Sequence, residues 1–147
     1  MLIDFKDVVS GALKPKLIGM MGLPRSGKST FCHQYLKPLG YVIVNPDSYR
    51  LALHGRPYIK NAEPTIWAAI TLTVDALLMT DQYVVIDATN ITPEAREPWE
   101  KRGAEFIHID TSVHVCLLRA ADNLELCNVI TRMNLVQKEW MPWINTK

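Results

Sequence analysis

The sequence predicts an α/β fold in which helices cover both faces of a central parallel sheet. Short apolar runs of strand length alternate with helical segments, which is the pattern of parallel strands joined by helical crossovers. A glycine-rich stretch, residues 22–30, separates the first apolar run from the first helix. The 147 residues suffice for one domain with a single core. We therefore expect one three-layer domain spanning residues 1–147.

Four apolar runs are predicted to form the sheet. They occupy residues 17–21, 41–44, 83–86 and 105–109. The run at 83–86 is apolar throughout, as expected of a central strand that is buried on both faces. Because ligands of such sheets bind at the carboxyl ends of the strands, the residues that follow each run are the candidates for function.

Helices are predicted between and after the strands. Gly40 ends the first helix, and Gly103 ends the one that Thr92 begins. Asn45 is placed to cap the second helix, with Pro46 at its first position. The predicted ranges are about 29–39, 46–53, 64–79, 93–102, 112–119 and 124–140, with a loop at 54–62.

The two ends of the chain are expected to be additions to this core. Residues 1–15 are predicted to be an amphipathic lead-in, in which Leu2, Ile3, Phe5, Val8 and Val9 share a helix face. Residues 120–123 separate the last two helices. We expect a helical lid at about residues 119–126, hinged at this break.

Composition excludes several classes of protein. The apolar runs look too short to span a bilayer, and the first fourteen residues lack the apolar core of a signal peptide. Cys32, Cys116 and Cys127 have no metal-binding spacing, so we expect reduced thiols in a cytoplasmic protein. The net charge of +1 makes no general case for nucleic acid, so a polyanionic partner would need a local basic patch.

The glycine-rich stretch matches the phosphate-binding loop, or P-loop, pattern G-x-x-x-x-G-K-S. Its glycines let backbone N–H groups face a phosphate, and the following helix N-terminus adds positive charge. Lys28 is predicted to reach the outer phosphates of a nucleotide, and Ser29 to bind Mg²⁺. The residues expected to bind the nucleotide are Gly22, Leu23, Pro24, Arg25, Ser26, Gly27, Lys28, Ser29 and Thr30.

The residues after the second strand suggest an acceptor site. Asp47 lies at a helix N-terminus, where it could orient and deprotonate an acceptor hydroxyl. Arg50 is three residues further along and shares its helix face, so the two could bind an acceptor that carries both a hydroxyl and a phosphate. The plainer alternative is a well-capped helix with an i,i+3 ion pair.

Asp87 and Arg119 are further candidates. Asp87 ends the third strand, where an acid that holds Mg²⁺ through water is expected. It could instead pair with Arg50 or serve as a turn residue. Arg119 precedes the lid, where it could fold over the nucleotide and stabilise charge on the transferred phosphate, although most surface arginines are merely solvated.

One local basic cluster contains an aromatic residue. It runs from Arg50 to Lys60 and includes Arg56 and Tyr58. Such a patch suits a nucleic-acid backbone with one base stacked on Tyr58, and it equally suits an ordinary solvated loop. Trp67, Trp99, Trp140 and Trp143 are expected to be packing residues.

Three segments resemble the 5′-kinase domain of bacteriophage polynucleotide kinase in order and spacing. They are residues 22–30, 45–50 and 85–90, and weaker similarity extends over about residues 17–133. The resemblance implies transfer of the ATP γ-phosphate to the 5′-hydroxyl end of DNA or RNA. It implies that Asp47 is the general base, that Arg50 contacts the acceptor's phosphate, and that Asp87 supports Arg50.

The chain departs from this family at two points. Of two lid arginines four residues apart, the first matches Arg119, but the second position holds Asn123. The acidic D-x-D-G-T motif of the fused phosphatase is missing, so a 3′-phosphatase activity is not expected.

Three other functions stay open. Zeta-toxin-like enzymes and related small-molecule kinases share the motifs loosely. A nucleoside monophosphate kinase fits less well, because a D-G-x-P-R-type lid is missing. A non-catalytic nucleotide-binding module is the alternative from another class, and Asp47 with Arg50 argues against it.

Overall fold

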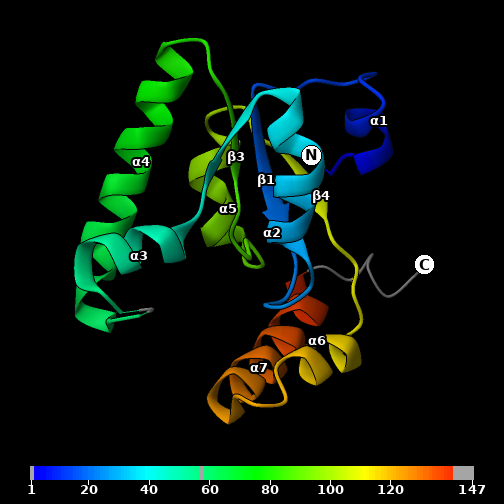
Figure 1. Cartoon of the computed structure of the whole chain (residues 1–147), viewed down its shortest axis with the longest axis vertical. Coiled ribbons are helices and arrows are strands. Elements are labelled where there is room, and N and C mark those ends of the chain that lie inside the picture. Colours follow the sequence, from blue (N-terminus) through cyan, green and yellow to red (C-terminus); the bar gives the residue numbers. More distant parts are fainter. Residues whose placement is uncertain (1, 57, 141–147) are drawn as a thin grey trace.

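The computed structural model describes residues 2–56 and 58–140. Four parallel strands form one sheet in the order β2-β3-β1-β4 (Figure 1). The strands are β1 (Leu17–Met21), β2 (Tyr41–Val44), β3 (Tyr83–Ile86) and β4 (Glu105–His108). The expected α/β class is confirmed, with β3 and β1 at the centre and β4 one residue shorter than predicted.

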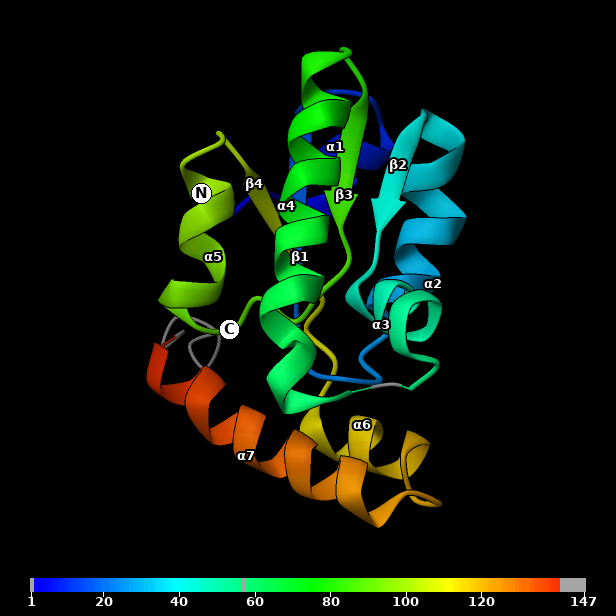
Figure 2. The ribbon, with the colours of Figure 1, turned by 90° about the vertical axis from the view of Figure 1, so that its left-hand side faces the viewer.

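Helices cover both faces of the sheet. Figure 2 shows α4 (Glu63–Met79) and α5 (Pro93–Glu100) in front of the strands. The opposite face carries α1 (Phe5–Val9) and α2 (Lys28–Phe31), and α2 continues as a π-helical turn (Cys32–Leu36) and a 3₁₀ turn (Lys37–Leu39). The predicted first helix is therefore present, and it ends at Gly40 in a left-handed conformation with φ 96°.

The remaining helices lie near the carboxyl ends of the strands. Asn45 caps α3 (Pro46–His54) by accepting from the Ser48 amide, as expected. A short 3₁₀ turn (Lys60–Ala62) leads into α4. The last two helices, α6 (Val113–Arg119) and α7 (Leu124–Trp140), lie below the sheet in Figure 2.

The lead-in differs from its prediction. Within residues 2–15 the helix is limited to Phe5–Val9, because Leu2 forms a parallel bridge with Phe106 and the Ile3 amide donates to the Phe106 carbonyl at 2.8 Å. The chain start therefore extends the open edge of β4. Phe5 instead meets Phe31 of α2, with ring centroids 5.7 Å apart.

Two buried clusters cover the sheet, one on each face. The cluster under α4 and α5 includes Ile66, Ile70, Val74 and Trp99. The other cluster packs Phe31, Cys32 and Leu36 against the opposite face. At Gly19 a Cβ would lie 2.3 Å from Cε1 of Phe106, so the close contact between β1 and that ring requires glycine.

One helix corrects the expectation that every apolar run is too short to span a bilayer. Within the described residues, Lys60–Met79 is long and apolar enough to cross a membrane when judged by length and composition alone. In the structure its inner face packs on the sheet through Ile66, Ile70 and Val74, each with no exposed surface. That packing accounts for the apolar inner face of the helix, whereas Leu72 and Met79 on the same helix are 71% and 85% exposed.

Two positions on α4 test this packing. Ile70 is fully buried, whereas Leu72, two residues along the same helix, is 71% exposed. We expect Ile70→Ala to lower the free energy of unfolding by about 2–5 kcal/mol, because it leaves a cavity. Leu72→Ala should change it by less than about 0.5 kcal/mol. Urea unfolding of both variants measures this, and equal effects would contradict the described core.

Candidate active site

The phosphate loop joins β1 to α2 at the carboxyl edge of the sheet. Gly22 has φ 153° and Gly27 has φ 103°, so both adopt backbone conformations that favour glycine. A Cβ on Gly22 would also lie 2.9 Å from the Ser26 hydroxyl and 3.0 Å from the Ile109 carbonyl. The loop therefore leaves no room for a side chain at its first glycine.

Lys28 is folded into this loop. Its ammonium donates to the carbonyls of Gly22 at 3.0 Å and Leu23 at 2.6 Å, and the residue is 8% exposed. Burial lowers the pKa of Lys28 to about 8, and the Asp87 carboxylate opposes that shift. The carbonyls of the loop thus bind the Lys28 ammonium, the group that is predicted to contact a phosphate.

Asp87 links the ends of β2 and β3 to α2. One of its carboxylate oxygens, Oδ2, accepts from the Ser29 hydroxyl at 2.6 Å and from the Asn45 amide at 3.0 Å. Its own backbone N–H donates to the Val44 carbonyl at 2.9 Å. The structure therefore brings together the two residues predicted to bind metal.

These oxygen donors fit Mg²⁺, which binds through one or two protein oxygens and the phosphates of its nucleotide. Among the described residues no group of three or more His, Cys, Asp or Glu side chains could hold a metal ion unaided. A cation at Ser29 and Asp87 would take its remaining ligands from water and from the phosphates of a nucleotide.

Arg50 is held by two carboxylates, and one of them was not predicted. Its Nη1 donates to Asp47 at 2.7 Å, while Nε and Nη2 donate to the two oxygens of Glu63 at 3.0 and 2.5 Å. The hydrogen bond to Glu63 raises the pKa of Arg50 above its ordinary value. The resemblance implied that Asp87 supports Arg50, but Asp87 is bonded to Ser29 and Asn45 instead, and Glu63 supports Arg50.

The predicted basic cluster lies beside this pair. The Arg50 guanidinium carbon is 5.7 Å from the centroid of the Tyr58 ring. Tyr58 is 61% exposed, and Arg56 is exposed as well. Both side chains are therefore available to an external ligand, and their predicted roles remain predictions.

Three residues that sequence reasoning missed form hydrogen bonds within the phosphate loop's surroundings, and one of them bonds the loop itself. Asn90, at φ 46°, donates to the Met20 carbonyl at 2.8 Å. The buried Arg96 donates to the carbonyls of Asn90 and Ile91 at 3.1 and 2.6 Å, and Thr111 donates to the Ser26 carbonyl at 2.6 Å. Only Asn90, within a segment already of interest, carried a sequence signal.

The α6–α7 pair packs directly on the phosphate loop. Leu23 lies in an apolar cluster with Ile91, Cys116, Ala120 and Ile130. This packing places Arg119 next to Arg25. Arg119 Nη1 donates to the Arg25 carbonyl at 2.9 Å, and Arg25 Nη1 donates to the Arg119 carbonyl at 3.3 Å. Two guanidinium groups therefore flank the loop.

Asn123 has a structural role at the position where a second lid arginine was expected. Its Oδ1 accepts from the Leu126 amide at 3.0 Å, and its carbonyl accepts from Cys127. Asn123 therefore caps α7, which begins at Leu124.

Among the tryptophans, Trp99 is buried, Trp67 is half-buried against it, and Trp143 lies outside the described residues.

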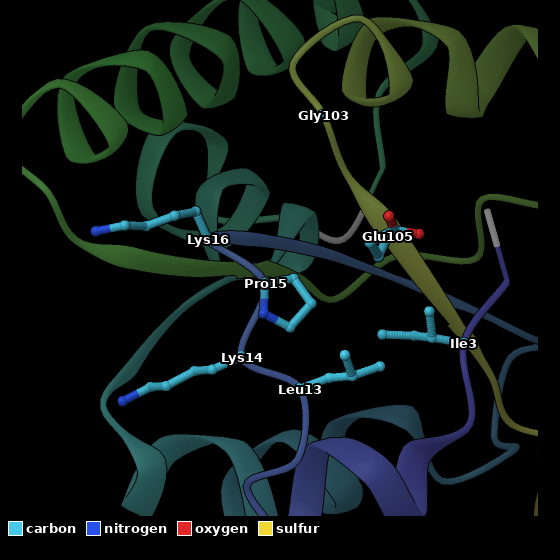
Figure 3. A pocket seen from close by; sticks show the side chains of 7 residues that line it. All are labelled: Ile3, Leu13, Lys14, Pro15, Lys16, Gly103 and Glu105. Atoms are coloured by element: carbon cyan, nitrogen blue, oxygen red, sulfur yellow. The ribbon is translucent and has the colours of Figure 1, made fainter.

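The pocket in Figure 3 lies at the other end of the sheet. It is lined by Ile3, Leu13, Lys14, Pro15, Lys16, Gly103 and Glu105, which precede β1 and β4 or belong to their first residues. Because ligands of parallel sheets bind at the carboxyl ends, the phosphate loop, and not this pocket, is the candidate site.

Lys28 makes stability depend on pH in a definite direction. Its pKa is about 8 when folded, against 10.5 as the ordinary value, so between these pH values the unfolded chain keeps a proton that the folded chain has lost. The free energy of unfolding should therefore rise with pH. Between pH 7 and 10.5 the rise should be about 3 kcal/mol larger in the wild type than in Lys28→Met. Denaturant unfolding from pH 7 to 10.5 measures this, and parallel curves would contradict it.

The cap at α7 can be tested by two substitutions. Asn123→Ala should lower the free energy of unfolding by about 1 kcal/mol, because the Leu126 amide loses its acceptor. Asn123→Asp keeps an oxygen at that position and should retain most of the stability. Thermal unfolding of both variants checks the assignment, and equal losses would refute it.

Comparisons with known proteins agree with the fold and the loop. Residues 17–122 match the family model AAA_33, an AAA domain. No curated protein matches the chain significantly. A chain of a Pnkp1/Rnl/Hen1 complex is 30% identical, with TM-score 0.65, over 71% of this chain and 38% of that one.

Two further solved structures share the fold. A chain of the Pnkp1/Rnl/Hen1 RNA repair complex is 24% identical, with TM-score 0.69, over 86% of this chain and 46% of that one. The Mycobacterium tuberculosis APS kinase CysC, in complex with AMPPNP and APS, is 19% identical, with TM-score 0.54, over 76% of this chain and 72% of that one. The chain spans less than half of both Pnkp1/Rnl/Hen1 chains. It belongs to the AAA domain family AAA_33 and has the fold of the P-loop kinases.

Proposed function

We propose that the protein is an ATP- and Mg²⁺-dependent kinase that transfers the γ-phosphate to the 5′-hydroxyl end of DNA or RNA. The observation that carries the acceptor side is Asp47 beside the phosphate loop. Its side chain is 69% exposed and is bonded to Arg50, which is only 16% exposed. Mere nucleotide binding needs no such exposed carboxylate fixed to a half-buried guanidinium.

The donor side rests on the loop and its partners. Lys28 and the backbone of Gly22–Thr30 would hold the phosphates, and Ser29 with Asp87 would hold Mg²⁺. When bound, MgATP supplies the phosphoryl group that is transferred. Arg119 and Arg25 flank the loop, where their charge would offset the negative charge that develops on the transferred group.

The acceptor side assigns two tasks to α3. Asp47 would accept the proton of the attacking hydroxyl and orient its oxygen toward the phosphate loop. Arg50 would bind a phosphate of the same acceptor, since a guanidinium offers several N–H donors in one plane. Positioning of the two reactants would provide most of the rate enhancement.

An extended polynucleotide is favoured over a small alcohol by the exposure of this surface. Asp47, Arg56, Tyr58 and Lys60 are all exposed, and Tyr58 offers a ring on which a base could stack. The resemblance to bacteriophage polynucleotide kinase and the 30% identity with a chain of the Pnkp1/Rnl/Hen1 complex support the same acceptor.

Transfer of labelled γ-phosphate to a panel of acceptors tests the proposal. The panel comprises a 5′-hydroxyl oligonucleotide, the same oligonucleotide already 5′-phosphorylated, nucleosides and sugar alcohols. We expect label only on the free 5′-hydroxyl end. Label on a small alcohol and none on the oligonucleotide would refute the polynucleotide acceptor and favour a small-molecule kinase.

Asp47→Asn tests the proposed base. It keeps the size of the side chain and removes the proton acceptor, so kcat should fall by about 10²–10⁴-fold while ATP affinity stays unchanged. The matched control is Asp81→Asn, in the exposed turn before β3 at the opposite end of the sheet. Full activity of Asp47→Asn would remove Asp47 from the mechanism.

A further inference from the structure

Glu63 binds Arg50 more extensively than Asp47 does. Glu63 receives two hydrogen bonds from the forked face of the guanidinium, through Nε and Nη2, whereas Asp47 receives one from Nη1. A guanidinium has five N–H donors. Three are therefore occupied, and two are left for another ligand.

The surroundings hold this arrangement in place. The Arg50 and Glu63 side chains are each 16% exposed, unlike an ordinary surface pair such as Lys101 and Glu97, which are 70% and 61% exposed. Glu63 is the first residue of α4, where the helix N-terminus favours a negative charge. It therefore joins α4 to α3, which packs against it (Figure 1).

The forked contact has a consequence for Asp47. Asp47 is three residues before Arg50 on the same helix face, so it is the other carboxylate within reach of the Arg50 fork. Because Glu63 occupies that fork, only Oδ1 of Asp47 accepts a hydrogen bond from Arg50, and no described residue donates to its Oδ2. Without Glu63, Arg50 would be free to turn its fork onto Asp47 and engage both oxygens.

We infer that Glu63 is the positioning residue of the acceptor site, and this inference rests on the proposed function. By binding the fork of Arg50, Glu63 keeps one oxygen of Asp47 free for the acceptor hydroxyl. It also aims the two remaining N–H groups of Arg50 at the acceptor's phosphate. Glu63 touches neither reactant and acts only through Arg50.

A double-mutant cycle tests this assignment. Glu63→Ala should lower kcat/KM for the 5′-hydroxyl oligonucleotide by roughly 10–100-fold, because the reacting groups are misplaced. The KM for ATP should stay within about twofold. Glu63→Gln, which keeps one acceptor oxygen, should fall between Glu63→Ala and the wild type. Glu97→Ala, which breaks the exposed ion pair, is the matched control and should be unchanged.

The cycle is completed in the Arg50→Ala background. If Glu63 acts only through Arg50, adding Glu63→Ala to Arg50→Ala should cause no further loss of activity. If the two substitutions instead lower activity by independent factors that multiply, the inference is overturned. It is also overturned if Glu63→Ala raises the KM for ATP and the KM for the acceptor equally, because that result would indicate a purely structural role. The inference would also be overturned if Glu63→Ala were as active as the wild type.

A spectroscopic readout separates this inference from the proposed function. The Arg50 Nε–H, bonded to Glu63, should give a slowly exchanging proton signal that disappears in Glu63→Ala and persists in Glu97→Ala. If the wild type labels only a small alcohol, the polynucleotide acceptor is refuted, and the same cycle on that alcohol decides the role of Glu63. If oligonucleotides are labelled but Glu63→Ala behaves as Glu97→Ala does, the inference alone fails.

Discussion

The carboxylate of Asp87 is the interaction on which the arrangement of the site depends. Its oxygen accepts from Ser29 of the phosphate loop and from Asn45 at the end of β2. These two bonds fix the loop and the α3 N-terminus relative to the end of β3. Since Asp47 follows Asn45 by two residues, the placement of the proposed base relative to the loop depends on this one buried carboxylate.

Sequence reasoning predicted the features that have a local cause. Apolar runs located all four strands, and the Asn45 and Thr92 caps located helix starts because a cap bonds to amides only a few residues away. The glycine spacing located the phosphate loop for the same reason. The helical lead-in was wrong in part, because pairing of residues 2 and 3 with β4 outweighed an amphipathic pattern.

Apart from the Ser29–Asp87 contact, which joins residues 58 apart in the sequence, the site was predictable only where its contacts are local. The Asp47–Arg50 pair follows from i,i+3 spacing, whereas Glu63 and Thr111 reach the site through contacts between elements that are separate in the sequence. Glu63 looks like an ordinary acidic residue at a helix start, so no local pattern could assign it to Arg50. Asn123 is the converse case, since a departure from a family motif turns out to be a helix cap.

The pairing of Ile3 with β4 has a consequence for solubility. β4 is one of the two edge strands of the sheet, and its free backbone groups would be a template for pairing with another molecule. The hydrogen bond from the Ile3 amide to the Phe106 carbonyl occupies part of that edge. Residues 2 and 3 therefore hinder self-association through β4. A tag or truncation that displaces them would expose the edge and favour aggregation.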